Sequence, residues 1–328
     1  MTVLVTGGAG YIGSHMVWKL LDEGEDVVVV DRLSTGFEWA IPAEAELVVG
    51  DIADQDLVES TMKRRDVDAV IHFAGSIIVP ESVADPLGYY LNNTVKSRAL
   101  IESAVRAGVP HFIFSSTAAV YGSNDGAPVV EEAPTLPESP YGTSKLMTEL
   151  MLRDAAAAHP FAYTALRYFN VCGADPKGRT GQSTRGATHL IKVACETATA
   201  KRPFMEIFGT DYPTPDGTCI RDYIHVWDLA EAHLLALRRL RAGGTSLIAN
   251  CGYGTGYSVL QVIDAVRRVV GHDLDVRISG RRPGDPASIV ANSERAQREF
   301  GWRPKLDDLD TIVTHALRWE EALKRRNS

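Results

Sequence analysis

The sequence predicts an α/β protein in which a doubly wound parallel sheet is joined to a smaller, interleaved C-terminal domain. Two observations lead to this fold class. In the first half of the chain, short apolar runs rich in valine and isoleucine alternate with segments of helical spacing, as in a parallel sheet covered by helices. After about residue 170 this regularity declines, and loops rich in glycine and proline separate shorter segments. We therefore expect residues 1–170 to form the sheet domain, with segments at about 218–250 returning to it, and residues 171–328 to form mainly the second domain.

A glycine-rich loop follows the first predicted strand, at residues 3–6. It reads Gly7-Gly8-Ala9-Gly10-Tyr11-Ile12-Gly13 and leads into a segment of helical spacing. Gly8, Gly10 and Gly13 fit the G-x-G-x-x-G pattern, in which glycines allow a tight turn and let a pyrophosphate approach the helix N-terminus. The loop therefore predicts a Rossmann-like dinucleotide-binding site.

The second predicted strand, at residues 27–30, ends at Asp31. A carboxylate at this distance after the glycine loop can accept hydrogen bonds from both hydroxyls of an adenosine ribose. It also repels the 2′-phosphate of NADP, so NAD is the favoured cofactor. The adjacent Arg32 weakens this preference, because an arginine near the ribose can accommodate that phosphate.

Polar or small residues follow the next predicted strands. Strands expected at 46–50 and 67–73 lead to Asp51-Ile52 and Ala74-Gly75, and a strand at 111–116 is followed by Thr117. A helix is expected at 89–107 and a further strand at 163–168. Ligands of such sheets lie beyond the carboxyl ends of the strands, so we expect these residues and Asp31 to line one crevice.

The stretch Ser139-Pro140-Tyr141-Gly142-Thr143-Ser144-Lys145 predicts the start of a helix. Ser139 is a good N-cap and Pro140 suits the first helical position, so Tyr141 and Lys145 lie one turn apart on one face. A free tyrosine has a pKa of about 10, and a nearby cation favours the phenolate that a base needs at neutral pH. Taken alone, this short pattern is more often an exposed tyrosine and a solvated lysine. Its place on the next helix, after the strand at 111–116 and a proline-rich connection at 128–140, lets the phenol face the same crevice and favours the catalytic interpretation.

The second half of the chain contains longer connections. A loop is expected at 173–186, a helix at 189–200, a proline-containing loop at 212–217 and a turn at 281–285. Arg221 and Arg282 lie in this half, and their forked donors would suit a phosphate group. Solvated surface arginines explain them equally well from the sequence alone.

Composition excludes several classes of function. The 328 residues carry 34 Lys and Arg against 42 Asp and Glu, a net charge of -8, which gives no electrostatic footprint for nucleic acid or an anionic membrane. The four cysteines form no C-x-x-C and the nine histidines show no ligand spacing, so we expect neither a metal nor a disulfide scaffold. No leader and no apolar run long enough to span a bilayer is visible, and we expect a cytoplasmic protein.

Seven motifs together resemble one known family. They are residues 6–15, 72–75, 114–122, 139–145, 166–170, 216–226 and 282–285. The chain resembles the extended short-chain dehydrogenase/reductase family, and within it the UDP-glucose 4-epimerases, over nearly its whole length. The resemblance implies interconversion of UDP-glucose and UDP-galactose by transient NAD-mediated oxidation at C4, with a tyrosine as base. It also implies a homodimer formed through the helices at 89–107 and 145–158.

The resemblance also implies a role for individual residues. Tyr141 is expected to be the base, Lys145 to bind the nicotinamide ribose and lower the pKa of Tyr141, and Thr117 to bridge the sugar O4 and the phenol. The expected cofactor-binding residues are Gly7, Gly10, Tyr11, Ile12, Gly13, Asp31, Arg32, Asp51, Ile52, Phe73, Ala74, Gly75, Asn93, Tyr141, Lys145 and Tyr168. The expected substrate-binding residues are Thr117, Asn170, His189, Leu190, Phe208, Arg221, Arg282 and Asp285.

Some positions depart from the commonest family pattern. Ile77 stands where a lysine often lies near the cofactor phosphates, so NAD is expected to be held less tightly. His189 and Lys192 replace an Asn and a Pro beside the substrate loop, and Ile289 aligns with a position that governs acceptance of N-acetylated sugars.

Three alternatives share this pattern to different degrees. Another UDP-sugar 4-epimerase, acting on an N-acetylhexosamine, a pentose or a uronic acid, would share the scaffold, and one acting on a uronic acid would also need a carboxylate contact that we do not find. A nucleotide-sugar dehydratase needs an acid/base pair after the active-site threonine, and this chain has Ala118-Ala119 there; a decarboxylase would need a carboxylate contact that we do not find. A non-catalytic NAD-binding regulator would have no need of Tyr141, Lys145 and Thr117 together.

Overall fold

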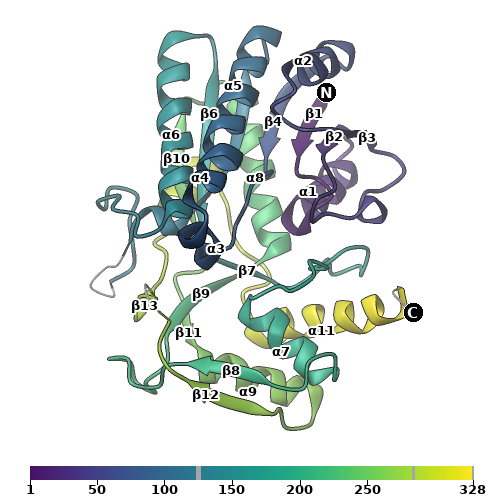
Figure 1. Ribbon diagram of the computed structural model, residues 1–328. Helices are drawn as coiled ribbons and strands as arrows, with labels where there is room; N and C mark the ends of the chain where they lie inside the picture. The colour runs from purple at the N-terminus through teal and green to yellow at the C-terminus, as the bar shows by residue number, and fades with distance from the viewer. Residues whose placement is uncertain (123–126, 283–284, 327–328) are drawn as a thin grey trace.

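A seven-stranded parallel sheet forms the centre of the larger part of the molecule (Figure 1). The computed structural model describes residues 1–122, 127–282 and 285–326. The strand order is β10-β6-β5-β4-β1-β2-β3, and every neighbouring pair is parallel. The strands are β1 (Thr2–Thr6), β2 (Asp26–Asp31), β3 (Glu46–Val49), β4 (Val67–His72), β5 (His111–Thr117), β6 (Ala162–Tyr168) and β10 (Leu247–Cys251). The predicted α/β class with a doubly wound parallel sheet is confirmed.

Two hydrophobic layers bury this sheet, because successive strand residues point to opposite faces. In β1, Val3 and Val5 belong to one cluster, whereas Leu4 belongs to the other. The first cluster packs the sheet against α1 (Tyr11–Asp22) and α8 (Val226–Arg241), which contact each other. The second packs it against α2 (Gln55–Arg64), α5 (Lys96–Ala107) and α6 (Pro140–Ala158). The short helix α10 (Glu294–Phe300) contacts α8 and β10.

The helix expected at 89–107 is not regular along its length. The segment starts as α4 (Pro86–Tyr89), continues through a π-helical turn at Tyr90–Val95 and then becomes α5. The π-turn carries Asn93, whose buried side chain accepts a hydrogen bond from Ser76 N and donates to Ser144 Oγ. Wide turns of this kind occur often at functional sites. Here the turn presents an amide between the loop after β4 and the start of α6, where the short α3 (Val79–Ala84) also packs.

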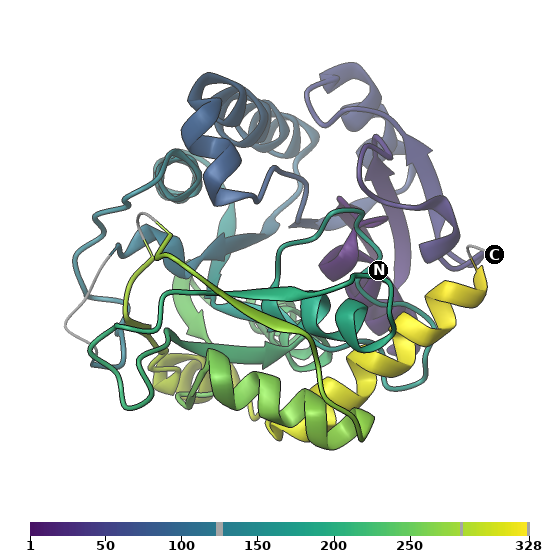
Figure 2. The same cartoon turned by 60° about the horizontal axis from the view of Figure 1, so that its bottom comes forward.

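The smaller part consists of two sheets and three helices. A four-stranded sheet contains β7 (Asn170–Cys172), β9 (Ile220–His225), β11 (Gly256–Ser258) and β13 (Ser288–Ile289), and β8 (Met205–Phe208) pairs with β12 (Val276–Ser279). Their core is shared with α7 (Leu190–Ala198), α9 (Val259–Val270) and α11 (Leu309–Arg326). Figure 2 shows α9 and α11 side by side across the near face, in agreement with their contacts. No strand was expected between Tyr168 and the predicted loop at 173–186, but β7 forms there because β9 offers it a parallel partner.

The chain passes repeatedly between the two parts. It leaves the large sheet after β6, forms β7, α7, β8 and β9 in the smaller part, and returns through α8 to the edge strand β10. The carboxyl ends of β1, β2, β4, β5 and β6 therefore face the smaller part of the molecule (Figure 1). Within the described ranges, no helix is long and apolar enough to cross a membrane.

Candidate active site

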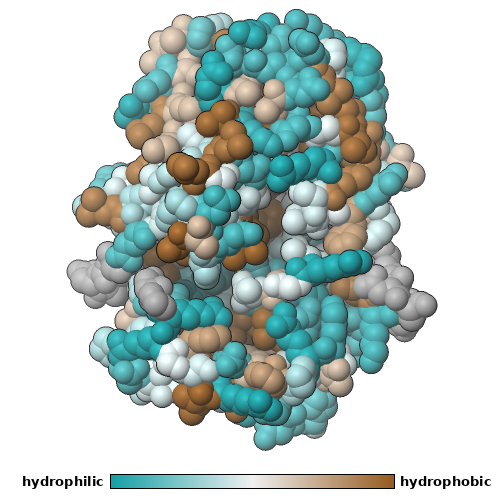
Figure 3. Space-filling model, viewed as in Figure 1, coloured by the Kyte–Doolittle hydropathy of each residue, from teal (hydrophilic) through white to brown (hydrophobic). Residues whose placement is uncertain are grey.

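One large cavity lies beyond the carboxyl ends of the strands. Its volume is about 760 Å³, and the space-filling view shows a recess at mid-height between the two parts (Figure 3). Most of the site residues predicted from the sequence line it. They are Gly7, Gly10, Tyr11, Ile12, Gly13, Asp31, Arg32, Asp51, Ile52, Phe73, Ala74, Gly75, Thr117, Tyr141, Lys145, Tyr168, Asn170, His189, Arg221 and Asp285.

Four predicted residues do not line this cavity. Asn93 lies behind its wall and holds the loop at Ser76. Leu190 lines a smaller adjacent cavity together with Asn170 and His189. Phe208 and Arg282 lie beside each other, with the guanidinium carbon 3.7 Å from the ring centroid. The next residues of the predicted turn, Pro283 and Gly284, are outside the described residues.

The glycine loop is packed so closely that side chains would not fit. Gly7 has a φ of +71°, and a Cβ there would lie 2.6 Å from Ala74 N. A Cβ on Gly13 would lie 2.1 Å from Gly7 O. Helix α1 starts at the N-cap Gly10, which has no side chain to accept hydrogen bonds from the first N–H groups of the helix. The residues of this first turn line the cavity, so their N–H groups are placed to bind an anion there. The loop thus has the form of a cradle for a pyrophosphate, which fits a dinucleotide cofactor.

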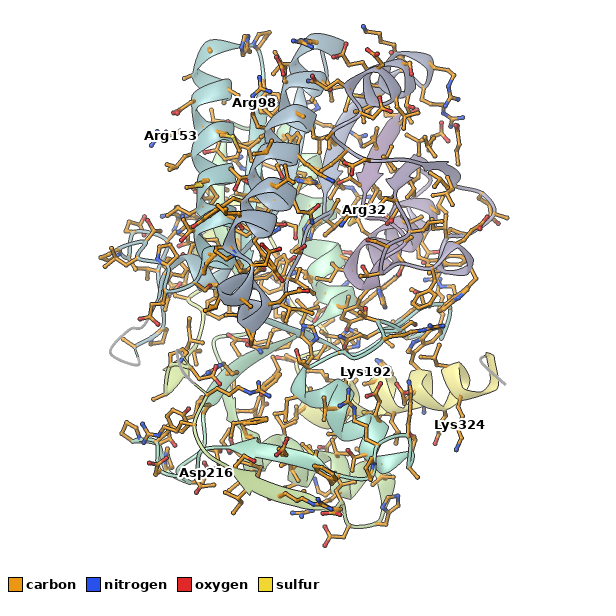
Figure 4. All side chains as sticks on the ribbon, in the orientation of Figure 1. Arg32, Arg98, Arg153, Lys192, Asp216 and Lys324 are labelled. Atoms are coloured by element: carbon orange, nitrogen blue, oxygen red, sulfur yellow. The ribbon has the colours of Figure 1, made fainter. Side chains whose placement is uncertain are left out.

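Two carboxylates mark the other end of the cradle. Asp31 accepts hydrogen bonds from Ala9 N at 2.9 Å and from Leu33 N at 2.8 Å, which ties the glycine loop to the end of β2. Asp51 forms an ion pair with Lys96, and Arg32 lies 3.9 Å from the same carboxylate oxygen. Figure 4 labels Arg32 at this side of the cavity. Burial acts to raise the pKa of Asp51, but the hydrogen bonds from Lys96 and Ala53 N and the charges of Lys96 and Arg32 together outweigh burial, and the pKa is lowered.

The sequence reasoning missed Lys96 and Gln182, which both line the cavity. Lys96 lies on the predicted helix one turn after Asn93, so helical spacing could have placed it there. Gln182 lies in a loop, and its Nε2 amide donates to His189 Nδ1 at 2.8 Å. No sequence pattern marks that position. Burial lowers the pKa of His189.

The catalytic residues predicted from the sequence converge at one point. Helix α6 begins where expected, because Ser139 Oγ accepts a hydrogen bond from Gly142 N and Pro140 occupies the first turn. Tyr141 and Lys145 are 9% and 4% exposed. Thr117 ends β5 beside them, and its hydroxyl oxygen accepts a hydrogen bond from Ala119 N at 3.1 Å. All three residues line the cavity that the glycine loop also lines.

The electrostatics of this group differ from the expectation in one respect. Burial raises the pKa of Tyr141, and a hydrogen bond with Thr117 acts in the opposite direction without reversing the change. A lowered pKa was expected from the neighbouring cation. That expectation is wrong for the protein alone, because Lys145 Nζ donates to Ser115 O at 2.9 Å and burial of the phenol dominates. Burial also lowers the pKa of Lys145 to about 8, and the Glu149 carboxylate acts against this change.

The far side of the cavity comes from the smaller part. Arg221 of β9 lies 3.4 Å from Asp285, and both line the cavity. Ile77 is half exposed at the rim, and the side chain of Ile289 is buried in the wall. Lys192 does not reach the large cavity; it lines the smaller one and pairs with Glu320 in a buried ion pair (Figure 4).

Comparison with known proteins agrees with this geometry. A family model described as the NAD dependent epimerase/dehydratase family matches residues 3–252. The chain belongs to this family. One relative, a UDP-glucose 4-epimerase from Azospirillum brasilense, is 57% identical over 323 residues, 98% of this chain and 93% of the relative. Another, from Halalkalibacterium halodurans, is 46% identical over 98% of this chain and 96% of the relative.

Solved structures of other members superpose closely on this one. The Brucella ovis UDP-glucose 4-epimerase in complex with NAD has a TM-score of 0.94 and 43% identity, covering 96% of this chain and 97% of that chain. The Bifidobacterium longum UDP-glucose 4-epimerase in complex with NAD+ and UDP has a TM-score of 0.92 and 38% identity, covering 98% of each chain. Membership of an NAD dependent family confirms the predicted cofactor.

The epimerase/dehydratase family includes two kinds of chemistry, and residues next to Thr117 distinguish them. Ala118 and Ala119 follow it and line the cavity. Neither side chain can donate or accept a proton, whereas elimination of water needs such a group. The two positions after Thr117 therefore offer no side chain for the proton transfer that a dehydratase needs.

Proposed function

We propose that this protein interconverts UDP-glucose and UDP-galactose, with NAD as its resident cofactor. The observation that carries the proposal is the meeting of Tyr141, Lys145 and Thr117 in the cavity that the glycine loop lines. A non-catalytic NAD-binding regulator has no need for these three groups at one point. The close relatives named UDP-glucose 4-epimerase support the same substrate.

The residues of the large sheet fit NAD. The glycine loop and the N-terminus of α1 would hold its pyrophosphate, and Asp31 would bind its adenosine ribose. Lys145 would bind the nicotinamide ribose. When bound, NAD supplies the acceptor and donor of a hydride at C4 of the sugar.

The chain's own groups manage the proton. Tyr141 takes the proton of the sugar O4 hydroxyl as general base and returns it as general acid. The Thr117 hydroxyl orients that sugar hydroxyl toward the phenol. Lys145 adds a positive charge that favours the phenolate, which burial of Tyr141 otherwise disfavours. All three side chains are largely buried, which limits their contact with bulk water.

The smaller part fits the nucleotide of the substrate. Arg221 and Arg282 would bind the diphosphate and Asp285 the uridine ribose, with Asn170, His189, Leu190 and Phe208 around them. Arg221 and Asp285 already lie together at the cavity wall. This assignment makes residues 1–170, with 218–250, the NAD-binding domain and residues 171–328 mainly the UDP-sugar domain.

A homodimer is part of the proposal. Leu87, Leu91 and Val95 are 76%, 55% and 53% exposed and follow one another at intervals of four residues along α4 and the π-turn. Met147 and Leu150 on the adjoining helix α6 are 39% and 41% exposed. A contiguous apolar face of this kind favours a twofold interface between two copies. We place such a dimer in the cytoplasm.

The test is incubation of the purified protein with UDP-galactose, without added NAD. We expect UDP-glucose to form until equilibrium, and denaturation of the protein to release NAD. Absence of UDP-glucose from protein that releases NAD would overturn the proposal, and a regulator would be favoured if the other UDP-sugars are not converted either. Parallel reactions with UDP-N-acetylglucosamine, UDP-xylose and UDP-glucuronate identify the sugar if UDP-galactose is a poor substrate.

A further inference from the structure

A buried ion pair lies behind the catalytic residues. Glu149 of α6 and Arg167 of β6 have side chains that are 2% and 4% exposed. Arg167 donates from Nε and NH2 to the two carboxylate oxygens, at 2.9 Å and 2.6 Å. Ser116 Oγ donates to the same carboxylate. Burial acts to lower the pKa of Arg167, but the hydrogen bonding and charge of Glu149, together with Tyr121, outweigh burial and raise the pKa, so the guanidinium stays charged.

The Glu149 carboxylate links three elements, α6, β5 and β6, which carry residues of the proposed catalytic site. Ser116 directly precedes Thr117 on β5, and Arg167 directly precedes Tyr168 on β6. Glu149 lies one helical turn after Lys145 on α6. Thr117, Tyr168 and Lys145 all line the cavity. A change in the position of Glu149 would therefore displace Thr117, Tyr168 and Lys145 as well.

Glu149 also carries a negative charge close to Lys145. The other groups that face this lysine come from two strands: His72 of β4, and the Phe114 ring and Ser115 carbonyl of β5. From β6, Tyr168 bonds to Ser115 and Arg167 pairs with Glu149. On α6 itself, Tyr141 and Glu149 lie one turn before and one turn after it. Burial lowers the pKa of His72 to about 3, with Lys145 contributing, so this imidazole is neutral. The Glu149 carboxylate is thus the nearby charge that favours the ammonium form of Lys145.

Stability does not account for this arrangement. Burying an ion pair costs so much desolvation that an apolar pair of similar size is often as stable or more stable. We propose that Glu149 is a positioning residue: it keeps Lys145 in its ammonium form and holds the strand ends that carry Thr117 and Tyr168. The proposal rests on the proposed function, in which Lys145 acts on the phenol of Tyr141 and on the cofactor ribose.

The test is a pH titration of Lys145 by NMR in protein labelled with 13C at the lysine Cε atoms. Lys145→Arg identifies the signal, because it removes that resonance. In Glu149→Gln we expect the midpoint to move to lower pH by about one unit, because the favourable charge is lost. In Arg167→Gln we expect a move to higher pH, because the Glu149 charge is no longer offset. Midpoints that stay in place, or that both move in the same direction, would overturn the proposal.

A single variant can leave a buried charge unpaired and fail to fold, so the double variant Glu149→Gln/Arg167→Gln is measured as well. It contains no unpaired charge, and its midpoint is expected below that of the parent and above that of Glu149→Gln. A midpoint at or above the parent value contradicts the proposal. The thermal midpoint of each variant separates loss of stability from the change in the Lys145 titration.

A second measurement ties the titration to the reaction. The decline of kcat at alkaline pH is expected to move in the same direction as the NMR midpoint in each variant. If the protein does not convert UDP-galactose, the proposed function fails, while the NMR titration still tests the role of Glu149. If the protein converts UDP-galactose but neither variant shifts the Lys145 titration, the proposed role of Glu149 is rejected and the proposed function is kept.

Discussion

Tyr141 and Lys145 lie one turn apart on α6, yet the lysine ammonium donates its hydrogen bond to the Ser115 carbonyl and not to the phenol. In the protein alone, the side-chain hydrogen bond that acts on the pKa of the phenol comes from Thr117 and not from the lysine. Burial raises the pKa of Tyr141 and lowers that of Lys145 to about 8. The phenol is therefore protonated in the protein alone. The positive charges of an oxidised nicotinamide and of Lys145 would together favour ionisation of the phenol.

Tyr141→Phe removes the phenolic hydroxyl and little else. We expect kcat to fall by about 10²- to 10⁴-fold, the usual contribution of a general acid or base, while the NAD content of the protein is unchanged. Conversion of UDP-galactose and NAD released on denaturation are the two measurements. Tyr163→Phe is the matched control, because Tyr163 is also buried but does not line the cavity. Near-normal turnover in Tyr141→Phe would exclude this residue as the base.

Gly13→Ala tests the cradle. The added Cβ would lie 2.1 Å from the carbonyl oxygen of Gly7, so the loop must move away from α1. We expect protein that folds but retains less than about a tenth of the parent NAD content, since a displaced backbone loses its approach to the pyrophosphate. Gly280→Ala is the control, because nothing lies within 4 Å of a Cβ there. Equal NAD content in the two variants would show that the loop does not hold the cofactor.

Leu91→Glu tests the apolar face. A charge on this exposed leucine would have to be buried in an interface between two copies. We expect sedimentation to show a mass of one chain for the variant and of two chains for the parent. Leu136 is also strongly exposed but lies outside these helices, so Leu136→Glu is expected to leave the mass unchanged. A parent protein that sediments as one chain would rule out the dimer.

Much of this site was predictable from local sequence. The glycine spacing located the cradle, and Ser139 and Pro140 located the start of α6 and hence Tyr141 and Lys145. What could not be predicted depends on contacts between distant segments. The π-turn at Asn93, the strand β7 and the ion pair of Glu149 with Arg167 each require a partner that no local pattern indicates. The raised pKa of Tyr141 was missed for the same reason, because burial is a property of the folded chain.

Buried histidines predict a loss of stability in acid. Burial lowers the pKa of His15 and of His233 to about 4 and that of His72 to about 3. An unfolded histidine titrates near 6.5, so below this pH the unfolded chain binds more protons than the folded one. Stability is fully present above pH about 6.5 and falls as the pH drops toward 4. Urea unfolding at a series of pH values measures this slope, and His233→Gln is expected to reduce it. An unchanged slope would mean that His233 is not buried in its neutral form.

Replacement of Ile77 by lysine is expected to increase the retention of NAD. This residue is half exposed at the cavity rim, and the sequence resemblance implies a lysine at this position near the cofactor phosphates. Ile77→Lys adds a cation that can pair with the pyrophosphate, so we expect slower loss of NAD during dialysis and a higher NAD content after purification. Ile77→Gln is the matched control, because it changes polarity and length without adding charge. If the glutamine variant retains as much NAD as the lysine variant, the gain comes from lost apolar exposure and not from charge. Raising the ionic strength provides an independent check, since only a charge-based gain diminishes as salt screens the pair.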